Sequence, residues 1–416
     1  MRSFKRLLTA FTAAAAVALV TAAGMTVTGT AAAAEPVRIG VIAPSAHVAG
    51  RSILQAAELA VDDLNENGGI NGRKVKLFKY DSHFQAADAV RAFQRAVQQD
   101  HVVAMTGVFI SEVGLSLQPW AARLKTPLII TGAASTKLDT NVHSNYSQLK
   151  YNFHQFTNST IIGQIACDFS HDVLVGKLGY QKAAVFAEDA AWTKPLVKAY
   201  DKCLPKAGLK VVDDIVFSPD TSDFRPIFNQ VKQKDPDVLI TAIAHVGVKP
   251  TVQWHQQEVP VLMAGANGQG GSTAFWNGTN GAAEGVIVGT TGAAGAPVSQ
   301  KTPDFFKRYK ARFGEDPAYN SYTEYDAIHV LKHAIERAGD TGADKLVDAL
   351  EKTDYTGVSG PISFYGKDDE FTHGLVYDSK RGAGVYFQWQ DGKQVPVWPD
   401  YLAGTNKVEI PAFVKK

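Results

Sequence analysis

The segment AVDDLNENGGINGRKVKL (residues 60–77) decides the fold class, because it joins the end of a helix, a tight turn and the start of a strand. Upstream, apolar residues recur at helical spacing over residues 50–65, after the apolar run VRIGVIA (Val37–Ala43). The turn at residues 67–72 is rich in Gly and Asn, which tolerate positive φ. The order strand, helix, strand predicts a parallel βαβ unit.

The same alternation continues along the chain and restarts after Phe156. Further strands are expected at residues 102–107, 127–131, 182–188, 209–217, 237–244, 259–265 and 285–291. Helices are expected at residues 86–99, 113–124, 160–174, 192–207, 224–234, 302–313, 321–338 and 343–352. One more helix is expected after the strand at 237–244, ending at about residue 257. The tail at residues 385–398 has the pattern of a hairpin around Asp391-Gly392. Two similar α/β halves with parallel sheets predict a two-lobed protein.

Composition excludes several classes of protein. The 416 residues contain 42 Lys and Arg against 41 Asp and Glu, a formal net charge of +1, spread along the chain. We therefore expect neither a polybasic nucleic-acid binder nor an acidic disordered tail. Two cysteines are too few for a small disulfide-dense fold.

Residues 1–34 have the three parts of a secretory signal peptide. Arg2, Lys5 and Arg6 precede an apolar stretch, and small residues end the segment at Ala34. A membrane anchor is the alternative, but it needs about 20 strongly apolar residues, and Ala, Thr and Gly dominate here. We expect cleavage near Ala34 and export.

Cys167 and Cys203 each fall in an expected helix, on either side of one expected strand. In an oxidising compartment, a disulfide between two neighbouring helices is a reasonable prediction. Two unrelated buried thiols are the alternative.

A search for catalytic or metal-binding motifs finds little. The chain has no G-x-S-x-G elbow, no Walker loop and no H-E-x-x-H, and the glycine-rich run at residues 265–271 lacks dinucleotide-binding spacing. His329 and His333 share one helix face but have no evident third ligand, so neither a metal nor a cofactor is predicted. Loops at the carboxyl ends of the expected strands instead predict a small-molecule cleft, where open α/β sheets bind their ligands. Binding is favoured over catalysis.

Several segments resemble one protein family along essentially the whole chain after residue 34. They are IGVIAPS near residue 39, residues 60–77, PLIITGAAS at 127–135, YDAIHVLKHAIERAG at 325–339 and FQWQDGKQVPVWP at 387–399. These segments look like a periplasmic solute-binding protein of ABC importers, in the leucine/isoleucine/valine-binding group. The resemblance implies the type I periplasmic binding fold, with two Rossmann-like lobes joined by a three-stranded hinge. It also implies lobe one at residues 36–154 plus 291–362, and lobe two at 155–290 plus 363–416.

The resemblance further implies where a ligand carboxylate would bind. The family's serine after the third strand matches Ser111, and its small-residue and hydroxyl loop after the fourth strand matches residues 133–135, with Ala133 and Ser135 as contacts. Hydroxyls and unpaired backbone N–H groups make charge-assisted bonds to an anion. A helix N-cap is the alternative role for Ser111.

The family's acidic residue for a ligand ammonium falls on Asn267, which carries no charge. Its aromatic residue in the first loop falls on Ala49, and a second-lobe tyrosine falls on Ala244. A carboxylate that lacks an amine, aromatic or aliphatic, therefore fits better than a branched-chain amino acid, because a buried ammonium needs a counter-charge. Asp189 or Glu188 remains an alternative source of that charge.

Trp192 and His245 complete the expected second-lobe contacts. Trp192 follows a strand and can stack on an apolar ligand or pack within its own lobe. We expect Trp192→Ala to weaken binding more than it lowers the melting temperature. His245 is either a cleft contact or a polar residue at a strand end.

The predicted function is an extracytoplasmic receptor that closes over an amino acid or an amine-free acid and delivers it to permease and ATPase subunits. We expect a monomer and no nucleic-acid partner. The alternatives are a ligand sensor of the same fold and a secreted hydrolase that uses His245 with Asp189 or Glu188.

Overall fold

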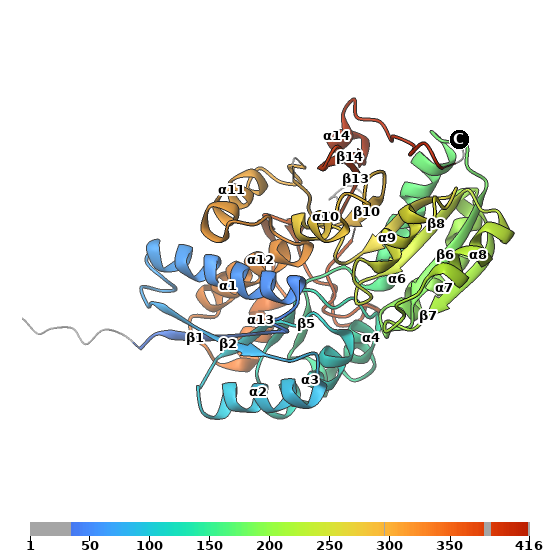
Figure 1. Ribbon diagram of the computed structural model, residues 1–416. Helices are drawn as coiled ribbons and strands as arrows, with labels where there is room; N and C mark the ends of the chain where they lie inside the picture. Colours follow the sequence, from blue (N-terminus) through green and yellow to red (C-terminus); the bar gives the residue numbers. More distant parts are fainter. Residues whose placement is uncertain (1–34, 295, 378–383, 415–416) are drawn as a thin grey trace, which may run out of the picture. The chain divides into compact units, whose positions relative to one another are not determined.

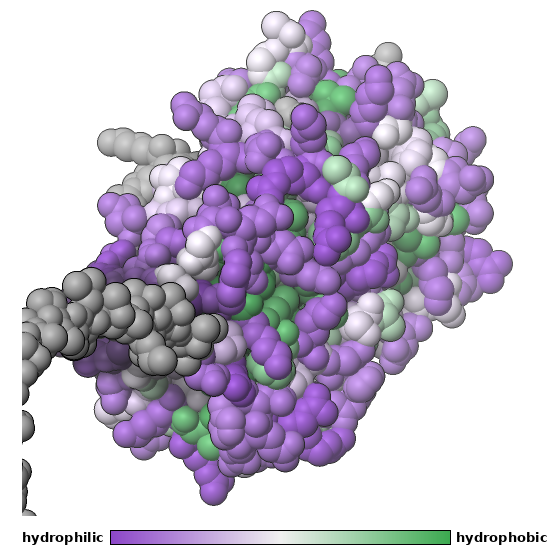
Figure 2. Space-filling view, turned by 90° about the vertical axis from the view of Figure 1, so that its left-hand side faces the viewer, coloured by the Kyte–Doolittle hydropathy of each residue, from purple (hydrophilic) through white to green (hydrophobic). Residues whose placement is uncertain are grey.

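The computed structural model describes residues 35–294, 296–377 and 384–414. The predicted signal peptide, residues 1–34, lies outside the described residues. No helix in the described part of the chain is long and apolar enough to cross a membrane. On the face drawn in Figure 2, hydrophilic side chains dominate and the apolar areas between them are small.

The first sheet contains five parallel strands from the N-terminal part of the chain. In sheet order they are β2 (Val75–Asp81), β1 (Val37–Ala43), β3 (Ala104–Gly107), β4 (Leu128–Ile130) and β5 (Asn152–His154). The sequence analysis misses β5, because a three-residue strand with polar ends gives no apolar run. The other four strands lie where the pattern predicts them.

Helices from two separated parts of the chain accompany this sheet. They are α1 (Val48–Glu66), α2 (Ala86–Gln98), α3 (Ser111–Arg123), α4 (Lys137–Ser144) and α5 (Tyr146–Leu149), and later α11 (Thr302–Phe313), α12 (Tyr319–Ala338) and α13 (Ala343–Leu350). The turn after α1 depends on Gly69, where φ is 76° and a Cβ would overlap the carbonyl oxygen of Arg73. Because α12 packs along α1, residues more than 250 positions apart share one core.

The second sheet contains seven strands. In sheet order they are β14 (Lys393–Trp398), β13 (Val385–Gln390), β10 (Ile287–Thr290), β9 (Leu262–Asn267), β8 (Val238–Ile243), β6 (Lys182–Glu188) and β7 (Lys210–Phe217). The five strands from β6 to β10 are parallel, and the C-terminal hairpin adds two antiparallel strands beside β10. In Figure 1 the blue and teal strands and the green and yellow strands form separate groups.

The first four helices of the second half begin and end close to their predicted limits, and the short α10 and α14 are not predicted. They are α6 (Ser159–Phe169), α7 (Thr193–Ala207), α8 (Arg225–Lys234), α9 (Lys249–Gln256), α10 (Thr273–Thr279) and, near the end, α14 (Asp400–Ala403). The helix predicted at 160–174 continues past Phe169 as a π-helical turn, η1 (Ser170–Val175). Cys167 on α6 and Cys203 on α7 are bonded through their sulfurs, with Cα atoms 6.0 Å apart.

The chain passes between the two sheets three times. It leaves the first sheet after β5, returns after β10 to form α11 to α13, and leaves again after a small hairpin of β11 (Tyr355–Gly357) and β12 (Gly360–Ile362). The first and third connections bond to each other: His154 N donates to the His373 carbonyl, and Leu375 N donates to the His154 carbonyl, each at 2.9 Å. The fold is therefore α/β with two lobes, and the lobe boundaries at 154/155, 290/291 and 362/363 stay a prediction.

One buried acid of α12 gives a test of this core. Glu324 is fully buried and accepts hydrogen bonds from the hydroxyls of Thr106 (2.5 Å) and Thr131 (2.7 Å). Burial raises the pKa of Glu324 to about 7, because its effect exceeds that of the two hydroxyl hydrogen bonds, which lower the pKa. Because the unfolded chain loses this proton near pH 4.5 and the folded chain keeps it to about 7, stability falls as the pH rises between these values.

We expect Glu324→Gln to raise the free energy of unfolding at pH 8 by on the order of 3 kcal/mol at most. The amide nitrogen can donate to the Thr131 hydroxyl, which has a second acceptor in the Gly107 carbonyl at 3.2 Å. Urea unfolding of both proteins at pH 5 and pH 8 measures the effect. If the free energy of unfolding of the variant falls between pH 5 and pH 8 as much as that of the wild type, the prediction is wrong.

Candidate functional site

A hollow lined by residues of both sheets and of the connections between them contains most of the predicted binding residues. It encloses about 1100 Å³ of non-protein space, including its opening to solvent. The lining residues are Phe109, Ser111, Gly132, Ala134, Phe156, Thr157, Ile162, Ile165, Trp192, Ala244, His245, Ala266, Asn267, Gly268, Gly289, Thr290, Thr291, Tyr319, Thr323, Ser359, Pro361, Leu375, Val376, Gly384 and Tyr386.

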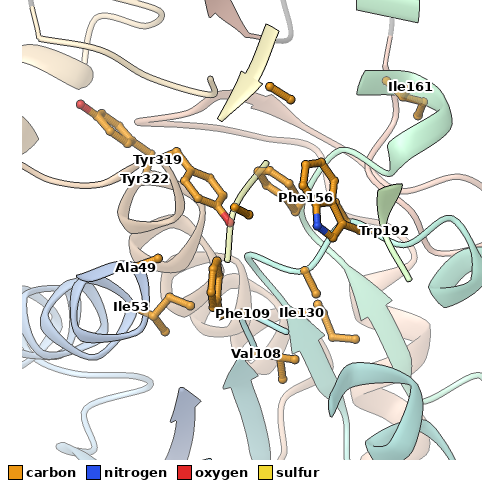
Figure 3. Close-up of a cluster of buried hydrophobic side chains, with 14 of the residues drawn as sticks. Ala49, Ile53, Val108, Phe109, Ile130, Phe156, Ile161, Trp192, Tyr319 and Tyr322 are labelled. Atoms are coloured by element: carbon orange, nitrogen blue, oxygen red, sulfur yellow. The ribbon is translucent and has the colours of Figure 1, made fainter. Parts of the chain in front are cut away.

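The walls of this cavity are mainly aromatic and aliphatic. Phe109, Phe156, Trp192 and Tyr319 come from four different segments and lie around a common space (Figure 3). The rings of Phe156 and Tyr319 are 5.2 Å apart, and the Tyr319 hydroxyl donates to the Gly132 carbonyl at 2.9 Å. A ligand here would bury an apolar or aromatic body.

Four of the six predicted contacts line the cavity: Ser111, Trp192, His245 and Asn267. Ala133 and Ser135 do not line it, whereas Ala134 between them does.

The expectation that this loop presents unpaired backbone N–H groups is wrong. The amides of Ala134 and Ser135 donate to the Ser111 hydroxyl oxygen at 3.3 and 3.1 Å, and the amide of Ala133 donates to the Val108 carbonyl at 3.0 Å. Ser111 is the first residue of α3 and Ile110 is its N-cap, so the N-cap alternative for Ser111 is also wrong. With its oxygen accepting two bonds, the Ser111 hydroxyl keeps its proton for a further acceptor.

A buried carboxylate lies directly behind the cavity wall. Glu188, at the end of β6, is fully buried and its Oε2 accepts from the amides of Ala244 (3.0 Å), His245 (2.8 Å) and Val246 (3.2 Å). Its Oε1 accepts from Trp192 Nε1 at 3.0 Å and lies 2.7 Å from His245 Nδ1. Trp192 therefore packs within its own lobe and also faces the cavity.

The electrostatics of this group favour an ion pair. Burial alone lowers the pKa of His245, but the hydrogen bond and the charge of Glu188 outweigh it, so the pKa is raised. Burial alone raises the pKa of Glu188, but His245 and the backbone amides outweigh it, so the pKa is lowered. His47, whose ring stacks on Phe109 at 4.9 Å, has its pKa lowered to about 4, first by burial and then by His245. Glu188 thus favours the charged form of His245, whereas burial favours the neutral form of His47.

Asn267 is the last residue of β9 and is only 6 % exposed. Its Oδ1 accepts from the amides of Gln269 (3.1 Å) and Gly270 (3.0 Å). Its Nδ2 has no hydrogen-bond partner among the described residues. The side chain is therefore fixed as a donor.

Sequence reasoning misses Phe156, Thr157, Tyr319 and Tyr386. The first two lie in the connection after the unpredicted β5, and the two tyrosines lie in segments whose pattern indicates only packing. Ala49, the predicted first-loop position, is buried outside the lining, while Ala244 is part of it.

The described residues contain no group of three side chains suited to a metal ion. His329 is buried, which lowers its pKa to about 3, and the ring of His333 lies tilted against that of Tyr355, with centroids 5.2 Å apart. The pair shares a helix face, as the spacing predicts, without a third ligand beside it.

Comparisons with known proteins identify the family and agree with the fold. The family model described as "Periplasmic binding protein" matches residues 36–377. A Leu/Ile/Val-binding protein homolog 7 from Brucella suis is 23% identical over 377 residues, which cover 87% of this chain and 90% of the relative.

Two solved structures share the fold. The branched-chain amino acid transporter substrate-binding protein LivJ from Streptococcus pneumoniae, in complex with isoleucine, has a TM-score of 0.74 at 22% identity, covering 88% of this chain and 100% of LivJ. A solute-binding protein of an ABC transporter from Rhodopseudomonas palustris, in complex with 3,4-dihydroxy benzoic acid, has a TM-score of 0.73 at 21% identity, covering 86% of this chain and 94% of the other. The matched family is one of binding proteins rather than of enzymes, so the hydrolase alternative finds no support. The chain belongs to the periplasmic binding protein family, with the type I fold of its leucine/isoleucine/valine-binding group.

Proposed function

We propose that this protein is the extracytoplasmic receptor of an ABC importer for an amino acid or an amine-free carboxylic acid. The observation that carries the proposal is the cavity itself, which is lined from both sheets and the connections between them, with aromatic walls and few polar side chains. Ser111, Trp192, His245 and Asn267 would hold the ligand, with Ala134 in place of Ala133 and Ser135. The lobes would close by bending at their three connections.

The proposed partners are a membrane permease and its ATPase, and the proposed location is the periplasm, reached by a cleaved signal peptide. The receptor would act as a monomer. A ligand sensor with the same fold is the second candidate. Uptake of labelled ligand by cells with and without the gene separates the two candidates. Loss of an importer receptor should reduce uptake, whereas loss of a sensor should leave uptake unchanged.

A thermal-shift screen of the purified, ligand-stripped protein tests the ligand class. The panel pairs leucine and valine with their 2-oxo acids, and phenylalanine with 3-phenylpropanoate and benzoate. A ligand that binds only the folded protein adds about 2.7 kcal/mol to the free energy of unfolding at a concentration of 100 times its Kd. The melting temperature rises as a result. We expect at least one compound to do so; a flat response to every compound would contradict the proposed ligand class.

A further inference from the structure

The polar side chains in the cavity wall differ from what an amino acid requires, and this point deepens the proposed function on which it rests. No Asp, Glu, Lys or Arg occurs among the described residues that line the cavity. A zwitterion brings one charge of each sign, and a buried ammonium without a carboxylate partner is costly. The question is therefore which charge the wall can accept.

Glu188 is the carboxylate that the lining residues Trp192 and His245 contact, but its oxygens are already occupied. The three amides on Oε2 and the two side-chain donors on Oε1 fill the acceptor sites of the carboxylate. Trp192 and His245 also stand between Glu188 and the cavity, since both line it and both contact Oε1. Glu188 therefore cannot receive a ligand ammonium, and Asp189, the other alternative that the sequence leaves open, does not line the cavity and pairs with Lys194.

His245 presents the opposite charge to the cavity. Its Nδ1 faces the Glu188 carboxylate, which only accepts, so Nδ1 carries a proton. Its Nε2 has no hydrogen-bond partner in the described part of the chain, and the side chain is 17% exposed. The other ionisable groups that face His245 are Glu112 of α3, which favours its charged form, and His47, which opposes it. The ring edge of Phe109, 5.5 Å away, completes its surroundings.

Two further polar side chains of the lining also offer protons. Asn267 is fixed with Nδ2 as an unpaired buried donor, and the Ser111 hydroxyl has its oxygen occupied by two amides. An ammonium at these three places would meet N–H and O–H groups. Acceptors in the wall are limited to uncharged hydroxyls and carbonyls.

We propose that His245, held as an imidazolium by Glu188, binds the carboxylate of an amine-free acid, and that Glu188 is the positioning residue that sets this specificity. Asn267 and Ser111 then donate to the remaining acceptor atoms of the ligand. An amino acid is rejected because its ammonium has no charged partner.

Isothermal titration with matched pairs tests the proposal: leucine against 4-methyl-2-oxopentanoate, and phenylalanine against 3-phenylpropanoate. Loss of one partner of a buried charge pair costs 2 kcal/mol or more, so we expect the acid to bind about 30-fold tighter than its amino acid. His245→Gln should weaken acid binding by about 30-fold. Glu188→Gln should do the same where the variant remains folded.

Asp189→Asn is the matched control, because Asp189 is adjacent to Glu188 but is 56% exposed and pairs with Lys194. It should leave acid binding unchanged within about twofold. In the wild type, acid affinity should fall as the pH rises through the raised pKa of His245, above 6.5. The neutral amide 3-phenylpropanamide should show no such change.

An amino acid that binds as tightly as its amine-free partner would overturn this inference, and so would wild-type acid affinity in His245→Gln. In both cases the protein still binds a small molecule, so the proposed receptor function stands. Failure of the proposed function has a different result, in which wild-type protein binds neither member of either pair.

Discussion

Trp192→Ala is expected to lower the free energy of unfolding of the empty protein by about 3–5 kcal/mol, the usual cost of truncating a buried tryptophan. Trp192 is only 7% exposed and its Nε1 donates to the buried Glu188 carboxylate. The same change should weaken ligand binding by about 30-fold, because aromatic anchors in desolvated pockets contribute 2 kcal/mol or more. The sequence-based expectation of a mainly binding effect is thus revised.

Trp192→Phe separates the two effects. Phenylalanine keeps a ring against the ligand and removes the N–H that donates to Glu188. We expect a stability loss of about 1.5–3 kcal/mol, typical of a hydrogen bond to a charged group, and a smaller loss of affinity than in Trp192→Ala. Urea unfolding and titration calorimetry measure both quantities. Full affinity in Trp192→Ala would mean that the indole does not contact the ligand.

The Cys167→Ser/Cys203→Ser double variant is expected to lose about 4 kcal/mol of stability. The bond closes a loop with a sequence separation of 36 residues, and a crosslink of that span removes chain entropy from the unfolded state. Ligand binding should change little, because neither cysteine lines the cavity. Chemical unfolding with and without reductant gives the comparison.

Reduced wild-type protein is the control for this variant and should match its midpoint. A wild-type midpoint that does not respond to reductant under unfolding conditions would contradict the bridge. A large loss of affinity in the double variant would show that α6 and α7 also position the site.

Much of the fold is predictable from the sequence, because apolar periodicity carries it. Strands such as β6 and helices such as α11 have the predicted limits, since long buried strands and amphipathic helices leave strong patterns. The short β5 leaves none, because its neighbours in the sheet rather than its own residues make it a strand.

The site is less predictable for a related reason. The positions of Ser111, Trp192, His245 and Asn267 follow from the rule that ligands bind at the carboxyl ends of strands. Which atoms they present does not follow from the sequence. Glu188 and Asn267 differ in charge, yet the side-chain oxygens of both accept hydrogen bonds from backbone amides of neighbouring turns. Those amides determine which atoms of each side chain are left to bind a ligand.

The pairing of distant segments affects the order in which the chain can fold. The helix α12, which packs along α1, ends at Ala338. The C-terminal hairpin, whose strand β13 pairs with β10, begins at Val385. During synthesis from the N-terminus, neither lobe has its complete set of partners until most of the chain has been made. We therefore expect stable folding of both lobes to follow synthesis rather than accompany it.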